Sequence, residues 1–117
     1  LTSVVGNSMS KPMKIADLKA HAQDVSGLLK TLSHANRLLI ACALTEGETN
    51  VSQIESDTNV PQPLLSRDLG RLRDAGLISA RRESKNVYYS ITDPRLSQLV
   101  DALCNAFAPE KLSGRLK

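Results

Sequence analysis

Residues 62–78 read QPLLSRDLGRLRDAGLI, and this stretch decides the fold. Its leucines recur at the spacing of one face of an α-helix, which predicts a helix with that face buried. The residues on this face are Leu65, Leu69 and Leu72. Pro63 suits a first helical turn, and Gly76 suits a position just past a helix end. We therefore expect a helix over residues 62–75 whose outer face is polar and basic.

A shorter helix is expected just before this one. Asn50 or Ser52 can cap its start, and Val51 and Ile54 face inward. It ends at residues 59–61, because the residue before a proline is disfavoured in the helical region. Two helices joined by a tight turn, the second basic on its outer face, predict a helix-turn-helix.

After the second helix the hydrophobic period changes from that of a helix to that of a strand. Apolar and polar residues alternate over residues 78–82, a polar tip follows at residues 83–86, and alternation resumes over residues 87–91. This pattern predicts a β-hairpin, or wing, with basic residues at and before its tip.

Three further helices complete the expected order. Residues 15–32 carry apolar side chains at a 3-4-3-4-3 spacing, a narrow seam that packs on another helix. Residues 37–44 are apolar on nearly all sides and predict a buried core helix. A last helix, capped by Thr92 or Asp93, carries a similar seam. The residues of that seam are Leu96, Val100, Leu103 and Phe107. Narrow seams on the first and last helices suit association with a second copy.

Length and composition indicate one globular domain, and the order of its predicted elements makes it a mainly α winged helix-turn-helix. With 117 residues, 41% hydrophobic and 23% charged, the chain is not disordered as a whole. We expect the domain over residues 13–108, a flexible N-terminal arm over residues 1–12 and a polar C-terminal tail over residues 109–117. No apolar run is long enough to span a bilayer, and no signal peptide is evident, so we expect a cytoplasmic protein.

The formal net charge is +3, and the excess of basic residues lies within residues 62–85. One basic face is typical of a protein that binds a polyanion, although a solvated helix face with local ion pairs would show the same charge. Exposed polar residues near a helix N-terminus, flanked by cations, suit the DNA major groove. The candidate DNA contacts are Gln62, Pro63, Ser66, Arg67 and Arg71 on the helix, and Arg81, Arg82, Lys85 and Asn86 on the wing.

These candidates divide into base and backbone contacts. Gln62 can read adenine and Arg67 guanine through paired hydrogen bonds, whereas Arg71 lies a turn later, where the backbone passes. The wing residues are placed for a minor groove or the adjacent backbone. Asp68 would repel phosphate, so we expect it to pair with Arg67 or Arg71, or to accept from a cytosine amino group. A basic surface without nucleic acid, and an architectural protein without sequence preference, are the alternatives.

Three stretches together resemble the ArsR/SmtB family of winged-helix repressors. They are TLSHANRLLIACALTEGE at residues 31–48, QPLLSRDLGRLRDAGLI at residues 62–78 and RRESKNVYYSI at residues 81–91. The resemblance covers residues 15–108. It implies a homodimer, held by the first and last helices, that binds a palindromic operator on double-stranded DNA and is released by an inducer. The family often has His where this chain has Asp68.

Within the family the chain is most similar to the sulfide- and persulfide-sensing branch of BigR, SqrR and HlyU. Cys42 matches the first reactive cysteine of that branch. The second aligns with Ala108, but Cys104 lies one turn earlier on the same helix face. The resemblance therefore implies a redox sensor formed by Cys42 and Cys104, with a reactive sulfur species or oxidant as inducer. The alternative is that both are small core residues.

A metal sensor and an enzyme are the remaining alternatives. The metal-sensing branches carry Cys-x-Cys where this chain has VSQIESDT at residues 51–58. Another branch binds zinc through Asp and His on the last helix, which here offers Asp93 and Asp101 but no His. His21 and His34 are the only histidines, so no metal site and no cofactor is predicted. No nucleophile motif, phosphate loop or metalloprotease motif occurs, and we expect no enzymatic activity.

Overall fold

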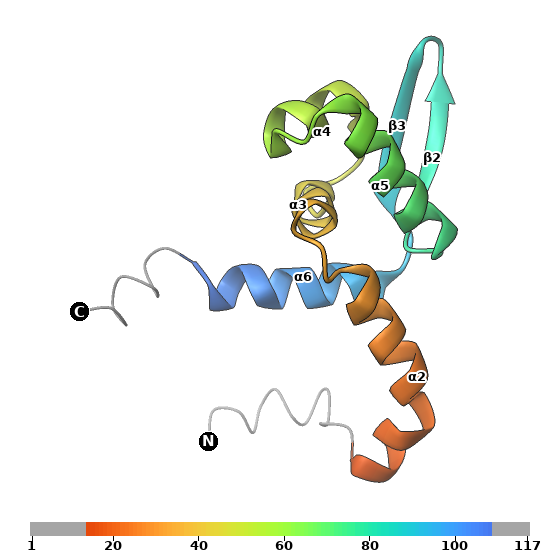
Figure 1. Cartoon of the computed structure of the whole chain (residues 1–117), viewed down its shortest axis with the longest axis vertical. Helices are drawn as coiled ribbons and strands as arrows, with labels where there is room; N and C mark the ends of the chain where they lie inside the picture. Colours follow the sequence, from red (N-terminus) through yellow and green to blue (C-terminus); the bar gives the residue numbers. More distant parts are fainter. Residues whose placement is uncertain (1–13, 109–117) are drawn as a thin grey trace, which may run out of the picture. The chain divides into compact units, whose positions relative to one another are not determined.

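The computed structural model describes residues 14–108, and these follow the predicted winged helix-turn-helix order (Figure 1). The elements are α2 (Ile15–Thr31), α3 (Ala35–Leu44), β1 (Thr49–Asn50), α4 (Val51–Thr58), α5 (Gln62–Asp74), β2 (Ile78–Glu83), β3 (Asn86–Ile91) and α6 (Pro94–Ala106). The expected arm (residues 1–12) and tail (residues 109–117) lie outside the described residues.

Helix α2 belongs to a unit of its own, which ends at Lys30. It ends one residue before the predicted end, at Thr31, and the apolar seam along the helix is open to solvent. None of its residues is buried, and Ile15 is 72% exposed. An apolar seam without cover is typical of a helix that needs a partner surface.

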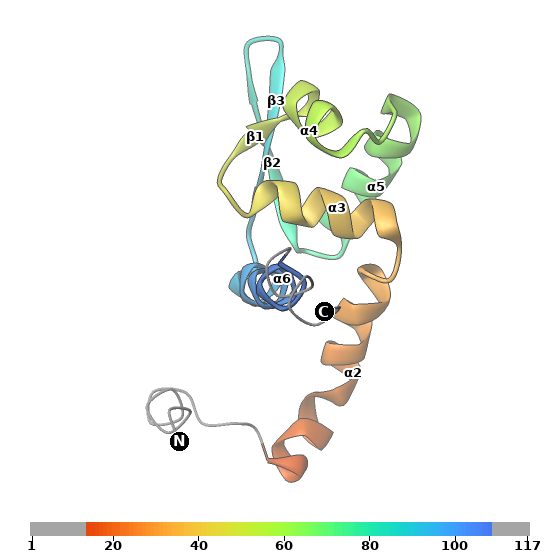
Figure 2. The ribbon, with the colours of Figure 1, turned by 90° about the vertical axis from the view of Figure 1, so that its left-hand side faces the viewer.

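The second unit, from Thr31 onward, is built around α3, which contacts α4, α5, α6 and β3 (Figure 2). Its core is aliphatic, as the scarcity of aromatic residues requires. The core residues on the helices are Ile40, Ala41 and Leu44, Ile54, Leu65, Leu69 and Leu72, and Leu96 and Val100. The prediction that α3 is buried on nearly all sides holds for one face only, because Leu39 is 46% exposed.

The helix ends follow local capping chemistry. Asn50 caps α4, since its side chain accepts from the Gln53 N–H at 2.8 Å. Asp93 caps α6 in the same way, accepting from the Arg95 N–H at 2.9 Å. Between α4 and α5, Asn59 takes the left-handed conformation at φ 61°. This conformation ends α4 and gives the tight turn of the helix-turn-helix.

The wing, residues 78–91, consists of the antiparallel strands β2 and β3. Arg81 pairs with Tyr88, and the chain reverses at Ser84, whose φ is 59°. A third strand was not predicted: β1 is two residues long and pairs with β3, with Thr49 opposite Tyr89. This short strand attaches the start of the helix-turn-helix to the wing (Figure 2).

Candidate nucleic-acid interface

The first turns of α5 face the wing across a cavity of about 340 Å³. Gln62 and Ser66 line it from α5, and Lys85 and Asn86 line it from the wing. The Ser66 hydroxyl donates to the Gln62 side-chain carbonyl at 3.0 Å, which orients the amide. The structure therefore brings together four of the predicted DNA contacts from two separate elements.

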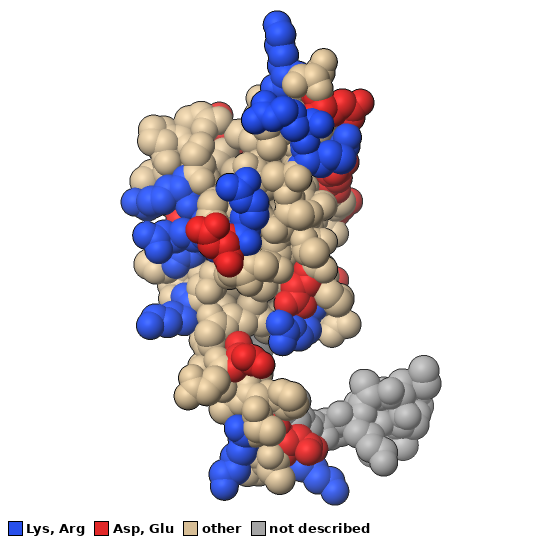
Figure 3. Space-filling model, turned by 90° about the vertical axis from the view of Figure 1, so that its right-hand side faces the viewer, with Lys and Arg blue, Asp and Glu red and all other residues tan. Residues whose placement is uncertain are grey.

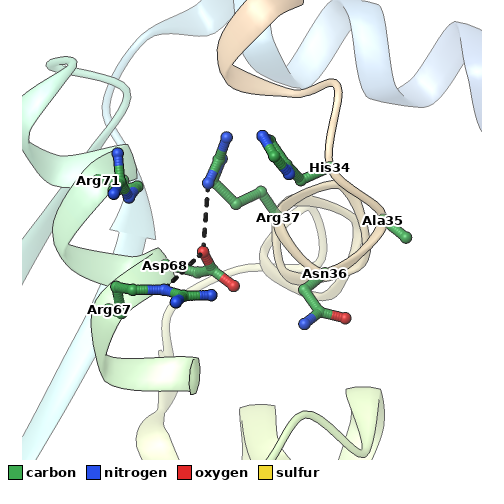
Figure 4. A pocket seen from close by; sticks show the side chains of 7 residues that line it. All are labelled: His34, Ala35, Asn36, Arg37, Arg67, Asp68 and Arg71. Carbon is green, nitrogen blue, oxygen red and sulfur yellow. Dashed lines mark hydrogen bonds and ion pairs between the residues drawn. The ribbon is translucent and has the colours of Figure 1, made fainter. Parts of the chain in front are cut away.

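The other side of α5 faces α3 across a cavity of about 430 Å³, the α3–α5 cavity (Figure 4). Residues 34–37, at the start of α3, form one wall, and Arg67, Asp68 and Arg71 form the other. The predicted contacts Arg67 and Arg71 thus lie on a different side of α5 from Gln62 and Ser66. A contribution from the start of α3 was not predicted.

Asp68 forms an ion pair inside the protein. It is only 2% exposed, and its Oδ1 lies 3.3 Å from Nη1 of Arg37, which is 8% exposed. Arg67 Nε lies 4.0 Å from the same oxygen (Figure 4). Of the expected partners Arg67 is found and Arg71 is not, whereas Arg37 was missed. Because Asp68 is buried, it does not reach a base.

A signal for the Arg37–Asp68 pair is present in the sequence. Asp68 directly precedes Leu69 and lies three residues after Leu65, which places it at the edge of the apolar face of α5. Arg37 also donates from Nε to the Thr31 carbonyl at 2.5 Å. Its guanidinium therefore connects α3, on which it lies, to Thr31 and to Asp68 on α5.

Arg81 is held by carboxylates within the protein. It donates to both oxygens of Glu48, at 3.0 and 2.8 Å, and to Glu83 at 2.6 Å. Its guanidinium also lies 4.9 Å from the centre of the Tyr88 ring. The hydrogen bonds from Arg81 lower the pKa of Glu48, and those to Glu48 and Glu83 raise the pKa of Arg81. Two acidic partners offset much of its charge, so Arg81 presents less net positive charge to DNA than its position in the sequence indicated.

Arg82 and Lys85 carry the remaining charge of the wing. Both are exposed, and within residues 14–108 the wing's ion pairs involve neither of them. Lys and Arg side chains gather at the tip of the wing and, on the same face, along α5 (Figure 3). The basic surface is thus divided between these two elements, as the charge distribution in the sequence indicated.

The two cysteines lie side by side. Cys42 on α3 and Cys104 on α6 place their Sγ atoms 3.7 Å apart. Cys104 is exposed, whereas Cys42 is partly buried and borders a cavity of about 380 Å³ with Glu46 and Asp57. Burial, and next the hydrogen bond with Cys104, raise the pKa of Cys42 to about 11. Ala108 lies past the end of α6.

Two further features concern metal ligands and membrane-spanning helices in the described part of the chain. Residues 14–108 contain no group of three His, Cys, Asp or Glu side chains that could hold a metal ion. His34 is the N-cap residue of α3, although its side chain makes no capping hydrogen bond. None of the helices in residues 14–108 is long and apolar enough to cross a membrane.

Comparison with known proteins gives a consistent result. Residues 34–80 match the family model described as bacterial regulatory protein, arsR family. The biofilm growth-associated repressor of Xylella fastidiosa is 41% identical over 95 residues, 81% of this chain and 83% of the relative. That of Agrobacterium fabrum is 38% identical over 114 residues, 92% of this chain and 97% of the relative. The crystal structure of BigR from Xylella fastidiosa matches with a TM-score of 0.79 and 42% identity, over 82% of this chain and 98% of that one.

Proposed function

Because the chain belongs to the ArsR family of bacterial regulatory proteins, we propose that it is a homodimeric repressor that leaves its operator when Cys42 and Cys104 become linked. Family membership makes the chain a DNA-binding transcriptional regulator and not an enzyme, in agreement with the prediction from the sequence. The 3.7 Å between the two sulfurs is the observation that carries the switch.

Sequence reading is assigned to the start of α5. Gln62 and Ser66 lie in the cavity that faces the wing, and Arg67 is exposed one residue further along the helix. In a helix-turn-helix protein the start of the second helix contacts base edges in the major groove. Arg82 and Lys85 then bind the neighbouring backbone without reading sequence.

Dimerisation is supported by the exposed apolar residues at the two predicted interface helices. Ile15, Val25 and Leu29 on α2 are exposed, and so is Phe107 at the end of α6, at 63%. Apolar surface of this kind marks an interaction site. A second copy is the occupant we propose, because a two-fold dimer presents two copies of α5 and so matches a palindromic operator.

The switch requires the transfer of one sulfur atom and the formation of one S–S bond. The thiolate of exposed Cys104 attacks the outer sulfur of a persulfide RSSH, which leaves Cys104–S–SH and RS⁻. Cys42, once deprotonated, attacks the Cys104 sulfur and expels HS⁻. Two thiols are oxidised to a disulfide, and the outer sulfur of the persulfide is reduced to sulfide. An S–S bond is about 2.05 Å long, so the sulfurs need only a small approach.

A covalent link would connect the core helix to the helix at the proposed dimer interface. Cys42 is on α3, which contacts α5, and Cys104 is on α6. Locking α3 to α6 would therefore change the spacing of the two α5 helices in a dimer. Half-site spacing is a fixed geometric requirement of such dimers, so a changed spacing weakens operator binding.

The test is operator binding before and after treatment with sulfur. An operator is selected from a randomised duplex library with the reduced protein, and binding is measured by fluorescence anisotropy. Tetrasulfide should release the DNA and give an intramolecular Cys42–Cys104 link in mass spectra, and Cys42→Ser and Cys104→Ser should stay bound. Release of both variants by tetrasulfide, or release of the untreated protein by zinc, would reject the thiol switch. The metal-responsive alternative would then take its place.

A further inference from the structure

We propose that the α3–α5 cavity holds one phosphate of the DNA backbone in each operator half-site, an inference that rests on the proposed function. The cavity measures about 430 Å³, with residues 34–37 on one wall and Arg67, Asp68 and Arg71 on the other. It is separate from the cavity where Gln62 and Ser66 face the wing. It therefore adds a contact that Gln62 and Ser66 do not provide.

The charge of the cavity favours an anion. Three guanidinium groups, those of Arg37, Arg67 and Arg71, line it against the single carboxylate of Asp68. That carboxylate is already bound by Arg37 at 3.3 Å, and both side chains of the pair are almost fully buried. Arg37 and Asp68 thus join the two walls, and Arg71 faces the cavity as the main cation for a ligand. A guanidinium group is well matched to phosphate oxygens.

The α3 wall supplies polar donors, those of His34 and Asn36. His34 is exposed, and its side chain makes no capping hydrogen bond to α3. Asn36 is partly exposed and carries an amide with two N–H donors. In Figure 4 His34 lies beside the Arg37 side chain, across the cavity from α5. A phosphodiester seated here would receive donors from both helices.

The position of the cavity agrees with the docking of α5. A helix in the major groove lies between two sugar–phosphate strands, about 12 Å apart. The wing adjoins α5 on the side of Gln62 and Ser66, and the α3–α5 cavity adjoins it on the side of Arg67 and Arg71. We assign one strand to the wing and the opposite strand to the cavity. Phosphate contacts on both sides fix the register of the recognition helix.

The test uses two substitutions whose effects on folding and on DNA binding have opposite signs. His34→Asp introduces a residue preferred at a helix N-cap, and Asn36→Asp adds a carboxylate to the first turn of α3. Both variants should fold at least as stably as the wild type in thermal unfolding. Each also brings negative charge to the proposed phosphate. Ser56→Asp, on exposed α4 surface outside the cavities described above, is the control for added charge.

We expect His34→Asp and Asn36→Asp each to weaken operator binding about tenfold at moderate salt, and Ser56→Asp to leave it unchanged. The plot of log affinity against log salt concentration has a negative slope, and its magnitude should decrease by about 1.8, since each of two half-sites loses one phosphate contact. In ethylation interference, ethylation of one phosphate per half-site should weaken operator binding by the wild type. Ethylation of the same phosphate should not change binding by Asn36→Asp.

The outcomes separate this site from the proposed function. If the wild type prefers no duplex, the proposed function fails. If the wild type binds its operator and both Asp variants bind with the same affinity and salt slope, the phosphate site fails alone. A second experiment measures binding of inorganic phosphate to the wild type and to His34→Asp. Submillimolar phosphate that binds the wild type and not His34→Asp, in the absence of DNA, would make this a site for a free anion and overturn the proposal.

Discussion

Arg37 of α3 holds Asp68 of α5 inside the protein, with Nη1 3.3 Å from Oδ1. The two side chains are 9% and 3% exposed, and they connect the core helix to the proposed recognition helix. A buried pair of this kind is costly to break, because loss of one partner leaves the other charge buried without compensation.

We therefore predict that Asp68→Ala and Arg37→Ala each lower the free energy of unfolding by about 3–5 kcal/mol. Urea titration followed by circular dichroism measures this difference. The double variant Arg37→Met with Asp68→Leu removes both charges and should recover most of the loss. Glu48→Ala, in an exposed ion pair, is the control and should cost far less. Single variants as stable as the wild type would show that the pair is not important for stability.

Arg67 and Arg71 are one turn apart on α5, and we predict different effects of their removal. Arg67→Ala should lose roughly 1–3 kcal/mol of operator binding and relax the preference at one base pair of each half-site. Arg71→Ala should weaken all duplexes alike and lower the salt slope, because phosphate contacts carry no sequence information. Binding to operators with single base changes measures both effects. Unchanged base preference in Arg67→Ala would remove Arg67 from the reading surface.

The wing should bind DNA through Arg82 and Lys85 more than through Arg81. Arg81 is held by Glu48 and Glu83, so its removal takes away little unpaired positive charge. We predict a clearly lower salt slope of operator binding for Arg82→Ala and Lys85→Ala, and a small change for Arg81→Ala. Glu48→Gln releases part of the Arg81 charge and should raise affinity for any duplex. A lower affinity in Glu48→Gln would contradict this assignment.

The fold was predictable because its signals are local. Leucine periodicity, Pro63 and Gly76 define α5, and alternation over residues 78–91 defines the wing. β1 was missed because two residues are too short to show any period. Its strand is defined only by pairing with β3.

The candidate site was predictable only in part, because ion pairs depend on tertiary packing. The sequence identified Arg81 as basic but did not show that Glu48, 33 residues away, binds it. In the sequence Arg67 is also far from His34 and Asn36. The contact of α3 with α5 brings these three residues to one cavity. The Cys42–Cys104 pair was predicted from the family resemblance. The short distance between the two Sγ atoms results from the packing of α3 on α6, which the sequence alone does not give.

The proposed dimer depends on residues 15–32 and 96–107. Leu103, which is partly exposed on α6, belongs to the predicted seam of that helix. Leu103→Asp would place a charge in the interface, where its desolvation is not offset. We predict a monomer or an aggregate in sedimentation velocity. Asp101→Asn, an exposed position on the same helix, is the control and should remain a dimer. An intact Leu103→Asp dimer would place the interface elsewhere.

Finally, we predict that the two thiols react in a fixed order. Cys104 is exposed, whereas burial raises the pKa of Cys42 to about 11, so little Cys42 thiolate exists at neutral pH. Because the thiolate is the nucleophile, alkylation of Cys42 by iodoacetamide should accelerate about tenfold per pH unit until the pH approaches that value. Mass spectrometry of timed samples gives the rate at each cysteine. In Cys104→Ala the hydrogen bond is lost, but burial is the larger cause and keeps the pKa of Cys42 above the usual thiol value. A Cys42 rate that levels off near the usual thiol pKa in the wild type, or Cys42 reacting before Cys104 at neutral pH, would contradict the proposed order of attack.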